Sequence, residues 1–299
     1  MSRAGAPGRS RLRRPGSKPR GRHRRTSRRR GSGSLVIVGT GLKTALHLTP
    51  EAREEISRAD PVFYLVSDPL SERWIKQLKP TARSLASCYV PGRPRMAAYR
   101  RMVDKILAPV RSGRRVCAAF YGHPGVSVFP SHEAIRKARE GGFDARMLPG
   151  ISVEDCLFSE LGLDPARSGC QSFEATDFLV YRRRFDPSSA LVLWQVGVVG
   201  NLDYSFRPAR SGLRLLARRL ARVYGKNHEV VLYEASVLPV LPSTIRSTTL
   251  DELPSAGVTG SMTLFVPPMP RPPDQESLRQ LNFSRATLRV VPTCWDPQT

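Results

Sequence analysis

Short apolar runs alternate along the chain, from Ser34 onward, with stretches in which apolar residues recur every three or four positions. The runs are typical of buried strands and the periodic stretches of amphipathic helices, so the alternation predicts an α/β fold. The predicted strands are Leu35–Val38, Val62–Val66, Val116–Tyr121, Ala145–Leu148, Leu191–Val196, Glu229–Tyr233 and Met262–Val266.

Three polar residues stand where helices are expected to begin. Thr49 precedes Pro50, which places an N-cap residue before a proline at the first helical position. Ser152 stands before the stretch VEDCLFSEL, and Thr249 lies three residues before Glu252, which is the spacing of a capping box. Each pattern predicts a helix that starts at the following residue.

The segment LRLLARRLARVYG predicts a helix whose apolar face is formed by Leu213, Leu216, Leu220 and Val223. Gly225 follows and is expected to end it. Near the C-terminus, the prolines of FVPPMPRPP are expected to end regular structure. The chain therefore divides into a basic tail (1–33), two α/β subdomains (34–148 and 149–270) and a Pro-rich, polar C-terminal tail (271–299).

The positive charge of the chain is unevenly distributed. Residues 1–31 contain thirteen Arg or Lys residues and no acid, which is more than half of the net charge of +23. Such a segment has little to bury and is expected to be disordered. Clustered guanidinium groups bind nucleic acid by releasing counterions, but a solvated leader, including one created by an upstream start codon, is the favoured interpretation. A transit peptide fits less well, because the segment has no amphipathic apolar face.

Other features exclude whole classes of protein. The tail lacks the apolar core of roughly 7–15 residues that a secretory signal needs, and no stretch is long enough to span a bilayer. The five cysteines are widely spaced without a C-x-x-C pair, which predicts neither a metal site nor a disulfide framework. We expect a cytoplasmic protein with no membrane partner.

Two glycine-containing loops follow predicted strands. Gly39-Thr40-Gly41 resembles the start of a dinucleotide-binding loop, but Thr44 stands where the third glycine is needed. The second loop, Tyr121-Gly122-His123-Pro124-Gly125, follows the strand at 116–121 and precedes a helical pattern. Open α/β sheets bind ligands at the carboxyl ends of their strands, although this pattern also fits a plain strand-to-helix turn.

Four motifs in one order carry a family resemblance. GTG after the first strand, FYGHPG, MLPGIS and WQVG resemble the tetrapyrrole methylase family of S-adenosylmethionine-dependent methyltransferases. Within that family, longer segments such as FYGHPGVSVFPSHEAI and GCQSFEATDFLV are similar to the borosin-type peptide backbone α-N-methyltransferases. The resemblance covers most of 34–268 and implies two α/β domains with S-adenosylmethionine in the cleft between them. It also implies a homodimer.

The same resemblance implies a cofactor-binding set. It places S-adenosylmethionine against Tyr121, His123, Val126, Ser152, Gln195, Val196 and Thr263. Each residue alone has a structural explanation: Ser152 as a helix N-cap, Gln195 and Val196 as strand-end residues, Thr263 as a strand threonine. Their joint occurrence in the order of the family favours the cofactor interpretation.

A second set is implied for catalysis. Tyr89 is expected to end a strand, and Arg95 and Tyr99 lie four apart in a helical pattern, on one face. From periodicity alone, Tyr99 fits an apolar stripe with Val103 and Val110. The resemblance instead implies that this Tyr–Arg–Tyr set lies over the methyl donor.

The chemistry of amide methylation explains these residue types. A peptide N–H is a very weak acid, because the nitrogen lone pair is delocalised into the carbonyl. A tyrosine, with an ordinary pKa of about 10, becomes a base when a neighbouring arginine favours phenolate. The arginine can equally hold the peptide carbonyl and stabilise charge on its oxygen. We assign Tyr99 as the base, Arg95 as the polarising group and Tyr89 as a positioning partner.

The sequence departs from the fungal relatives at its C-terminal end. Those enzymes carry their substrate as an extension, whereas only about thirty residues follow FVPP here. This resembles the split arrangement, in which a separate precursor peptide binds in trans. A tail that methylates itself at Val290–Trp295 is the alternative. In the first loop, Leu42-Lys43 replaces the Pro-Gly of tetrapyrrole enzymes, so we expect Gly39 and Gly41 to admit a peptide backbone and the loop to face the substrate.

Three other functions fit the fold. Tetrapyrrole carbon methylation is disfavoured because Gly122-His123-Pro124 replaces the usual G-D-P. Ribosomal RNA 2′-O-methylation suits the positive charge, but that charge is concentrated in the tail. A basic module that binds nucleic acid or a precursor without catalysis is disfavoured by the presence of Tyr89, Arg95 and Tyr99.

Overall fold

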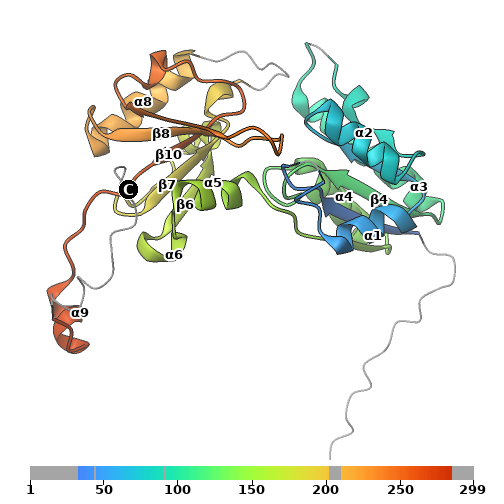
Figure 1. Ribbon diagram of the computed structural model, residues 1–299, viewed down its shortest axis with the longest axis horizontal. Coiled ribbons are helices and arrows are strands. Elements are labelled where there is room, and N and C mark those ends of the chain that lie inside the picture. The colour runs from blue at the N-terminus through green and yellow to red at the C-terminus, as the bar shows by residue number, and fades with distance from the viewer. Residues whose placement is uncertain (1–32, 44, 91, 202–209, 285–299) are drawn as a thin grey trace, which may run out of the picture. The chain divides into compact units, whose positions relative to one another are not determined.

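In the part of the chain that the structure describes, two five-stranded sheets form the framework (Figure 1). The computed structural model describes residues 33–43, 45–90, 92–201 and 210–284. Residues 1–32 of the basic tail and the Val290–Trp295 segment therefore lie outside the described residues. Strands and helices alternate through most of the described chain, which confirms the predicted α/β fold.

The first sheet is entirely parallel, in the order β3-β2-β4-β1-β5. Its strands are β1 (Ser34–Gly39), β2 (Val62–Leu65), β3 (Arg83–Ser84), β4 (Arg115–Phe120) and β5 (Asp144–Met147). In a parallel sheet all carboxyl ends lie at one edge, so the loops after β1, β4 and β5 meet there. Apart from β3, these strands were all predicted, to within one or two residues.

Helices cover both faces of this sheet. They are α1 (Pro50–Arg58), α2 (Pro69–Leu78), α3 (Arg95–Arg111) and α4 (Phe129–Glu140). Leu35 and Ile37 of β1 pack with residues of α3 and α4, whereas Val36 and Val38 pack with residues of α1 and α2. This two-sided burial is why the strands are continuous apolar runs. Thr49 caps α1 as predicted, because its hydroxyl accepts the Ala52 N–H.

The second sheet is mixed, in the order β6-β7-β10-β8-β9. Only the β6–β7 pair is parallel. The strands are β6 (Cys170–Glu174), β7 (Ala190–Trp194), β8 (Glu229–Glu234), β9 (Thr244–Thr249) and β10 (Thr263–Val266). The helices of this half are α5 (Val153–Leu161), α6 (Pro165–Ser168), α7 (Ala175–Val180) and α8 (Arg210–Tyr224). The two sheets lie on either side of position 148 in the sequence, but the division into subdomains stays a prediction.

Two helix predictions require correction. Thr249 ends β9, and although its hydroxyl accepts the Glu252 N–H, only the 3₁₀ turn Leu253–Ser255 follows. Gly257 adopts a φ of +63° and so stops the turn before an α-helix can form. The helix α9 (Gln275–Gln280) begins where the prolines were expected to end regular structure, because the Asp274 carboxylate caps the Ser277 N–H.

The prediction for helix α8 assigned one residue wrongly to the apolar face. Leu213, Leu216 and Leu220 are buried as expected, and Gly225 follows the helix with a φ of +89°. Val223, however, is 44% exposed, and Tyr224 is buried in its place. Eleven positions separate Leu213 from Tyr224, which is close to three full turns of 3.6 residues, whereas Val223 falls off the face.

Candidate functional site

Three loops meet backbone to backbone at the carboxyl edge of the first sheet. The Gly122 N–H donates to the Gly41 carbonyl at 2.8 Å, and the Gly41 N–H donates back at 3.2 Å. A Cβ on Gly39 would stand 2.5 Å from the Gly122 carbonyl oxygen and 2.8 Å from Gly150 Cα. The loop after β1 is therefore packed directly against the loops after β4 and β5.

The expectation that Gly39 and Gly41 admit a substrate backbone is wrong. The space that a side chain on Gly39 would take is filled by other loops of the protein. Gly41 has a φ of +68°, and a Cβ there would lie 2.1 Å from His47 Cβ. Both glycines let parts of this chain approach one another.

Leu42 and Lys43 also contact other parts of their own chain. Leu42 is buried in a cluster with Leu157, Trp194 and other side chains of the second half. The Lys43 Nζ lies 3.8 Å from the Glu160 carboxylate. These contacts give both side chains that replace the Pro-Gly sequence a structural role, and the expectation that the loop faces the substrate stays a prediction.

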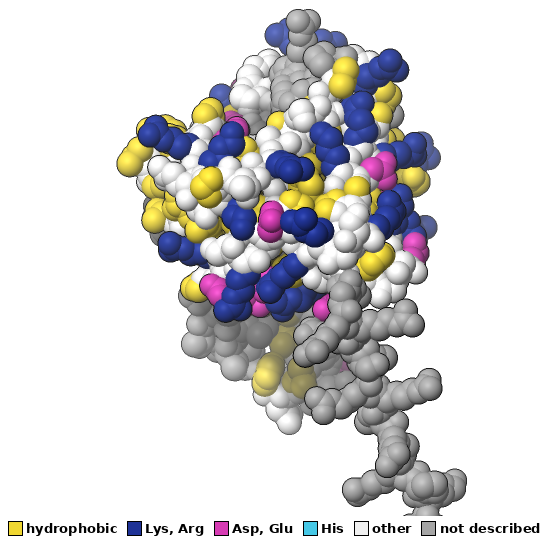
Figure 2. Space-filling model, turned by 90° about the vertical axis from the view of Figure 1, so that its right-hand side faces the viewer, with side chains coloured by type: hydrophobic (Ala, Val, Ile, Leu, Met, Phe, Trp, Pro, Cys, Tyr) yellow, Lys and Arg dark blue, Asp and Glu magenta, His cyan; other side chains and the backbone are white. Residues whose placement is uncertain are grey.

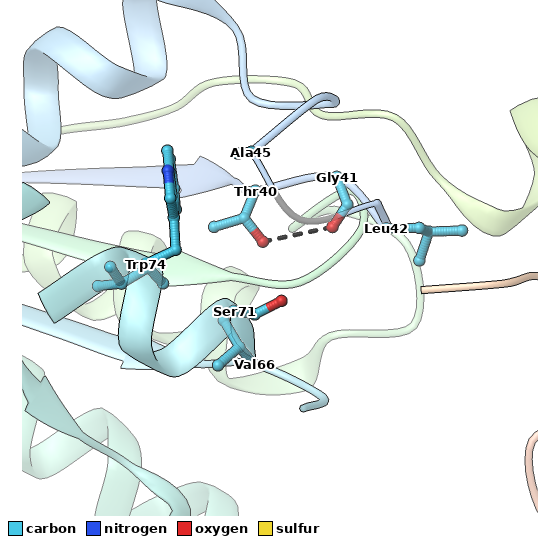
Figure 3. Close-up of a pocket in the computed structure, with 8 residues that line it drawn as sticks. Thr40, Gly41, Leu42, Ala45, Val66, Ser71 and Trp74 are labelled. Atoms are coloured by element: carbon cyan, nitrogen blue, oxygen red, sulfur yellow. Dashed lines mark hydrogen bonds between the residues drawn. The ribbon is translucent and has the colours of Figure 1, made fainter. Parts of the chain in front are cut away.

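A small hollow lies beside this loop (Figure 3). It is lined by the loop after β1, by Val66 and by three residues of α2: Ser71, Trp74 and Ile75. The Thr40 hydroxyl bonds the Gly41 carbonyl at 3.3 Å within it. Its volume of about 10 Å³ is roughly the room of one water molecule, so as it stands the hollow is too small for a nucleoside-sized cofactor.

The predicted cofactor loop after β4 is a tight, internally bonded turn. The His123 Nδ1 accepts the Gly125 N–H at 2.9 Å, and the Val126 N–H donates to the His123 carbonyl at 3.1 Å. With Nδ1 acting as an acceptor, a neutral His123 carries its proton on Nε2. Tyr121 begins the turn and is 47% exposed.

Ser152 closes a complete capping box at the start of α5. Its hydroxyl accepts the Asp155 N–H at 3.2 Å, and the Asp155 carboxylate accepts the Ser152 N–H at 2.6 Å. The hydroxyl also donates to that carboxylate. The N-cap explanation from the sequence is therefore confirmed, and a contact with a cofactor stays a prediction.

Gln195, Val196 and Thr263 come together at the ends of neighbouring strands. Gln195 has φ 57° and ψ 36°, a left-handed conformation that costs a non-glycine residue about 1–3 kcal/mol. The Val196 N–H then donates to the carbonyl of Met262, which directly precedes Thr263 at the start of β10. A side chain held in an unfavourable backbone conformation at a strand end is typical of a functional site.

The structure also brings the predicted catalytic tyrosines together. Their rings meet edge to face, with centroids 6.3 Å apart and planes at 76°. Tyr99 also stacks on Phe129, with centroids 6.0 Å apart. Tyr89 does not end a strand as expected, because the 3₁₀ turn Ala86–Cys88 precedes it. Arg95, the first residue of α3, donates from its guanidinium to the Asn201 carbonyl, close in sequence to Gln195.

Sequence reasoning missed two residues that shape this region. Phe129 begins α4 and packs against Tyr99; its apolar position directly after the glycine loop was a usable signal. His47 accepts the N–H groups of Leu42 and Lys43, both at 3.3 Å. Burial lowers the pKa of His47, and the nearby Lys43 lowers it further. No motif in the sequence marks this histidine.

Among the described residues, no three or more His, Cys, Asp or Glu side chains gather closely enough to hold a metal ion. No helix in the same part of the chain is both long and apolar enough to cross a membrane. The thiols of Cys117 and Cys170 are protected by burial, which raises the pKa of Cys170 to about 11 and that of Cys117 further.

Solved structures share this fold. Uroporphyrin-III-C-methyltransferase from Thermus thermophilus superposes with a TM-score of 0.55 and 21% identity, over 79% of this chain and 92% of that one. Cobalt precorrin-4 methyltransferase superposes with a TM-score of 0.56 and 16% identity, over 78% of this chain and 94% of that one. At these identities the likeness concerns the fold alone.

Fungal relatives are more similar in sequence. A methyltransferase/ribosomally synthesized cyclic peptide gymnopeptides precursor of Gymnopus fusipes is 40% identical over 267 residues, covering 87% of this chain and 64% of its own length. A type I borosin cyclic peptide precursor of Serendipita vermifera subsp. bescii, also named a methyltransferase, is 40% identical with 65% of its length covered. The corresponding protein of Coprinopsis marcescibilis is 38% identical, with 71% covered. The chain thus spans about two thirds of each of these three relatives.

The family profile of the Tetrapyrrole (Corrin/Porphyrin) Methylases matches residues 34–254. That range begins at β1 and ends in the 3₁₀ turn after β9, so it contains the first sheet, both tyrosines and the Gln195 turn. The chain belongs to the tetrapyrrole (corrin/porphyrin) methylase family.

Proposed function

We propose that this protein is an S-adenosylmethionine-dependent methyltransferase that methylates backbone amide nitrogens of a peptide. The observation that carries the proposal is the pairing of Tyr89 and Tyr99, edge to face, with Arg95 one helical turn before Tyr99. Relatives whose names join a methyltransferase to a cyclic-peptide precursor, at 40% identity, support the peptide as substrate class.

The predicted cofactor residues have donor groups that suit S-adenosylmethionine. The exposed ring of Tyr121 offers a stacking surface, and the carboxamide of Gln195 can both donate to and accept from an adenine edge. His123, Val126, Ser152, Val196 and Thr263 complete the set that would hold the cofactor. When bound, S-adenosylmethionine supplies an electrophilic methyl group.

The residues of this chain then remove the amide proton and stabilise the charge that develops. We assign Tyr99 to remove the amide proton through its phenol oxygen, and Tyr89 to hold the Tyr99 ring in place by its edge-to-face contact. Arg95 stabilises negative charge on the peptide carbonyl oxygen as the proton leaves. One of its five N–H donors is used by the Asn201 carbonyl, which fixes the guanidinium and leaves other donors for the substrate.

The direct test uses purified protein, S-adenosylmethionine and a separately added synthetic peptide with an apolar core. Mass spectrometry should detect additions of one methyl mass, and fragmentation should place them on backbone nitrogen. Substitution of Tyr99 by Phe should lower the single-turnover rate by about 10²–10⁴-fold, the usual contribution of a general base. Tyr89→Phe should lower the rate less, because phenylalanine keeps the aromatic ring that contacts Tyr99.

Tyr181→Phe is the matched control, because Tyr181 is 69% exposed at the end of α7. It should leave the rate unchanged. Full activity in Tyr99→Phe would overturn the assignment of the base, and methylation confined to side chains would overturn the reaction class. A separate peptide as substrate and a homodimer are parts of this proposal. Intact-mass analysis of the enzyme alone tests whether the substrate is a separate peptide, and light scattering tests whether the protein is a homodimer.

A further inference from the structure

The loop after β1 is joined to α5 by a chain of polar contacts. Lys43 Nζ lies 3.8 Å from Glu160 Oε1, and the Tyr233 hydroxyl donates to Glu160 Oε2 at 2.9 Å. The Lys43 and Glu160 side chains are 29% and 27% exposed, so water only partly screens their attraction. Glu160 thus binds a flexible cation on one oxygen and a fully buried phenol of β8 on the other.

An apolar contact reinforces the ionic one. Leu42, next to Lys43, is 8% exposed and belongs to the cluster that contains Leu157 of α5 and Tyr233. The loop is also stiffened from within, because His47 accepts the N–H groups of Leu42 and Lys43. The side chains at positions 42 and 43 therefore fix where this loop lies.

The same loop is hydrogen-bonded to the predicted cofactor turn after β4. Gly41 and Gly122 exchange two backbone hydrogen bonds, and His123 follows Gly122 directly. The N-cap of α5 is Ser152, another predicted cofactor residue. Lys43 thus lies two residues from the backbone pairing that holds the turn containing His123.

We propose that Lys43 and Glu160 are positioning residues, which hold the loop after β1, and through the Gly41–Gly122 pairing the His123 turn, in register with α5 and Ser152. The inference rests on the proposed function, because it assigns these residues to cofactor binding. The negative charge of Glu160 is the essential property. A neutral carboxamide could still accept the Tyr233 hydroxyl, but would not attract Lys43.

The test measures the dissociation constant of S-adenosylmethionine by calorimetry. Glu160→Gln and Lys43→Met should each weaken binding by about 2- to 5-fold, the range of a partly exposed ion pair. The double variant should be no weaker than either single one, because both remove the same interaction.

A second measurement reports on the Gly41–Gly122 backbone pairing. Hydrogen exchange of the Gly41 and Gly122 amides should accelerate in both single variants, while strand amides of β1 and β4 keep their protection. The matched control is the Arg136–Glu140 pair on α4, which is exposed and spaced i, i+4. Arg136→Met should change neither the affinity nor the exchange at Gly122.

The outcomes separate two failures. If the wild-type protein does not bind S-adenosylmethionine, the proposed function fails and this inference with it. If the wild type binds and both variants bind equally well, only the positioning role is overturned. An effect in Glu160→Gln without one in Lys43→Met would also overturn it, because the effect would then act through Tyr233 alone.

Discussion

At the scale of single residues, the loop after β1 shows how one histidine makes folding pH-dependent. His47 accepts two backbone N–H groups on Nδ1, which only an unprotonated nitrogen can do. Its pKa is lowered first by burial and then by Lys43, while Glu160 opposes the shift. The unfolded chain therefore takes up this proton at a higher pH than the folded one.

It follows that stability from His47 is complete above its ordinary pKa of about 6.5 and is lost as pH falls through the lower, folded value. We expect the free energy of unfolding, measured with urea, to decrease between pH 7 and pH 5.5 more in the wild type than in His47→Ala. Subtracting the two curves removes the contributions of the other titrating groups. Parallel curves would contradict the prediction.

At the same scale, Gly39 leaves no room for a side chain. An added Cβ would stand 2.5 Å from the backbone oxygen of Gly122, and backbone cannot rotate away as a side chain can. Gly39→Ala should destabilise the protein by about 1–3 kcal/mol through overpacking, measured by denaturant unfolding.

The control is Gly142→Ala, where the new Cβ meets nothing within 4 Å but φ is +77°. That variant should cost about 1 kcal/mol from backbone conformation alone. Gly39→Ala should also impair cofactor binding, because Gly122 directly precedes His123. A stable Gly39→Ala variant with normal binding would show that the loops can separate without consequence.

At the scale of elements, α5 combines a structural and a predicted functional role at one residue. Ser152→Ala removes both hydrogen bonds of its hydroxyl, and loss of an N-cap costs about 1 kcal/mol. Ser152→Thr keeps a hydroxyl and should retain most of the cap. We expect denaturant unfolding to follow this order.

Cofactor affinity distinguishes the two roles of Ser152. If the hydroxyl also contacts S-adenosylmethionine, Ser152→Ala should weaken binding even at a temperature where the variant is fully folded. Binding unchanged in the folded variant would reduce Ser152 to a helix cap, and would remove it from the predicted cofactor set without affecting the others.

Elements were predictable from the sequence where burial imposes a simple pattern. Strands β1, β4 and β7 are continuous apolar runs because they are buried on both faces, and each was predicted within one or two residues. Strand β9, TIRSTT, is polar and largely exposed, so its sequence carries no such pattern. The two-residue β3 is too short for periodicity to show.

The candidate site was predictable to a different degree. The family resemblance placed Tyr89, Arg95 and Tyr99 in one set, whereas periodicity alone assigned Tyr99 to an apolar stripe, and the structure brings the two rings together. The partners of the glycines were not predictable, because a glycine indicates close approach but not what approaches. Gly39 therefore suggested a substrate backbone, where the structure has Gly122 and Gly150. The role of Glu160 depends on contacts between distant segments, which no local pattern records.

At the scale of the whole molecule, positive charge is the dominant surface property. The net charge is +23, and on the face in Figure 2 Lys and Arg side chains are spread widely among few acidic ones. A hollow beside α8 is lined by three arginines of that helix, Arg214, Arg218 and Arg222, by Lys226 just beyond it, and by Asp251. None of these four cations pairs with a carboxylate of the described residues.

Unpaired surface cations bind polyanions without sequence preference, because they displace condensed counterions. We expect the full chain to bind single-stranded oligonucleotides weakly, with an affinity that falls steeply as salt rises. In fluorescence titrations, the slope of log affinity against log salt is about 0.7 per phosphate contact. Replacing Arg214, Arg218 and Arg222 together by Gln should therefore reduce that slope by up to about 2.

Peptide methylation by the same variant decides what this charge contributes to function. The three arginines lie on α8, and none belongs to the predicted cofactor or catalytic sets. Methylation of a neutral peptide should therefore keep its wild-type rate while oligonucleotide binding weakens. If methylation and oligonucleotide binding both decrease, the arginines of α8 contribute to binding the peptide substrate as well. An unchanged salt slope would instead assign polyanion binding to other cations of the chain, foremost the thirteen of residues 1–31.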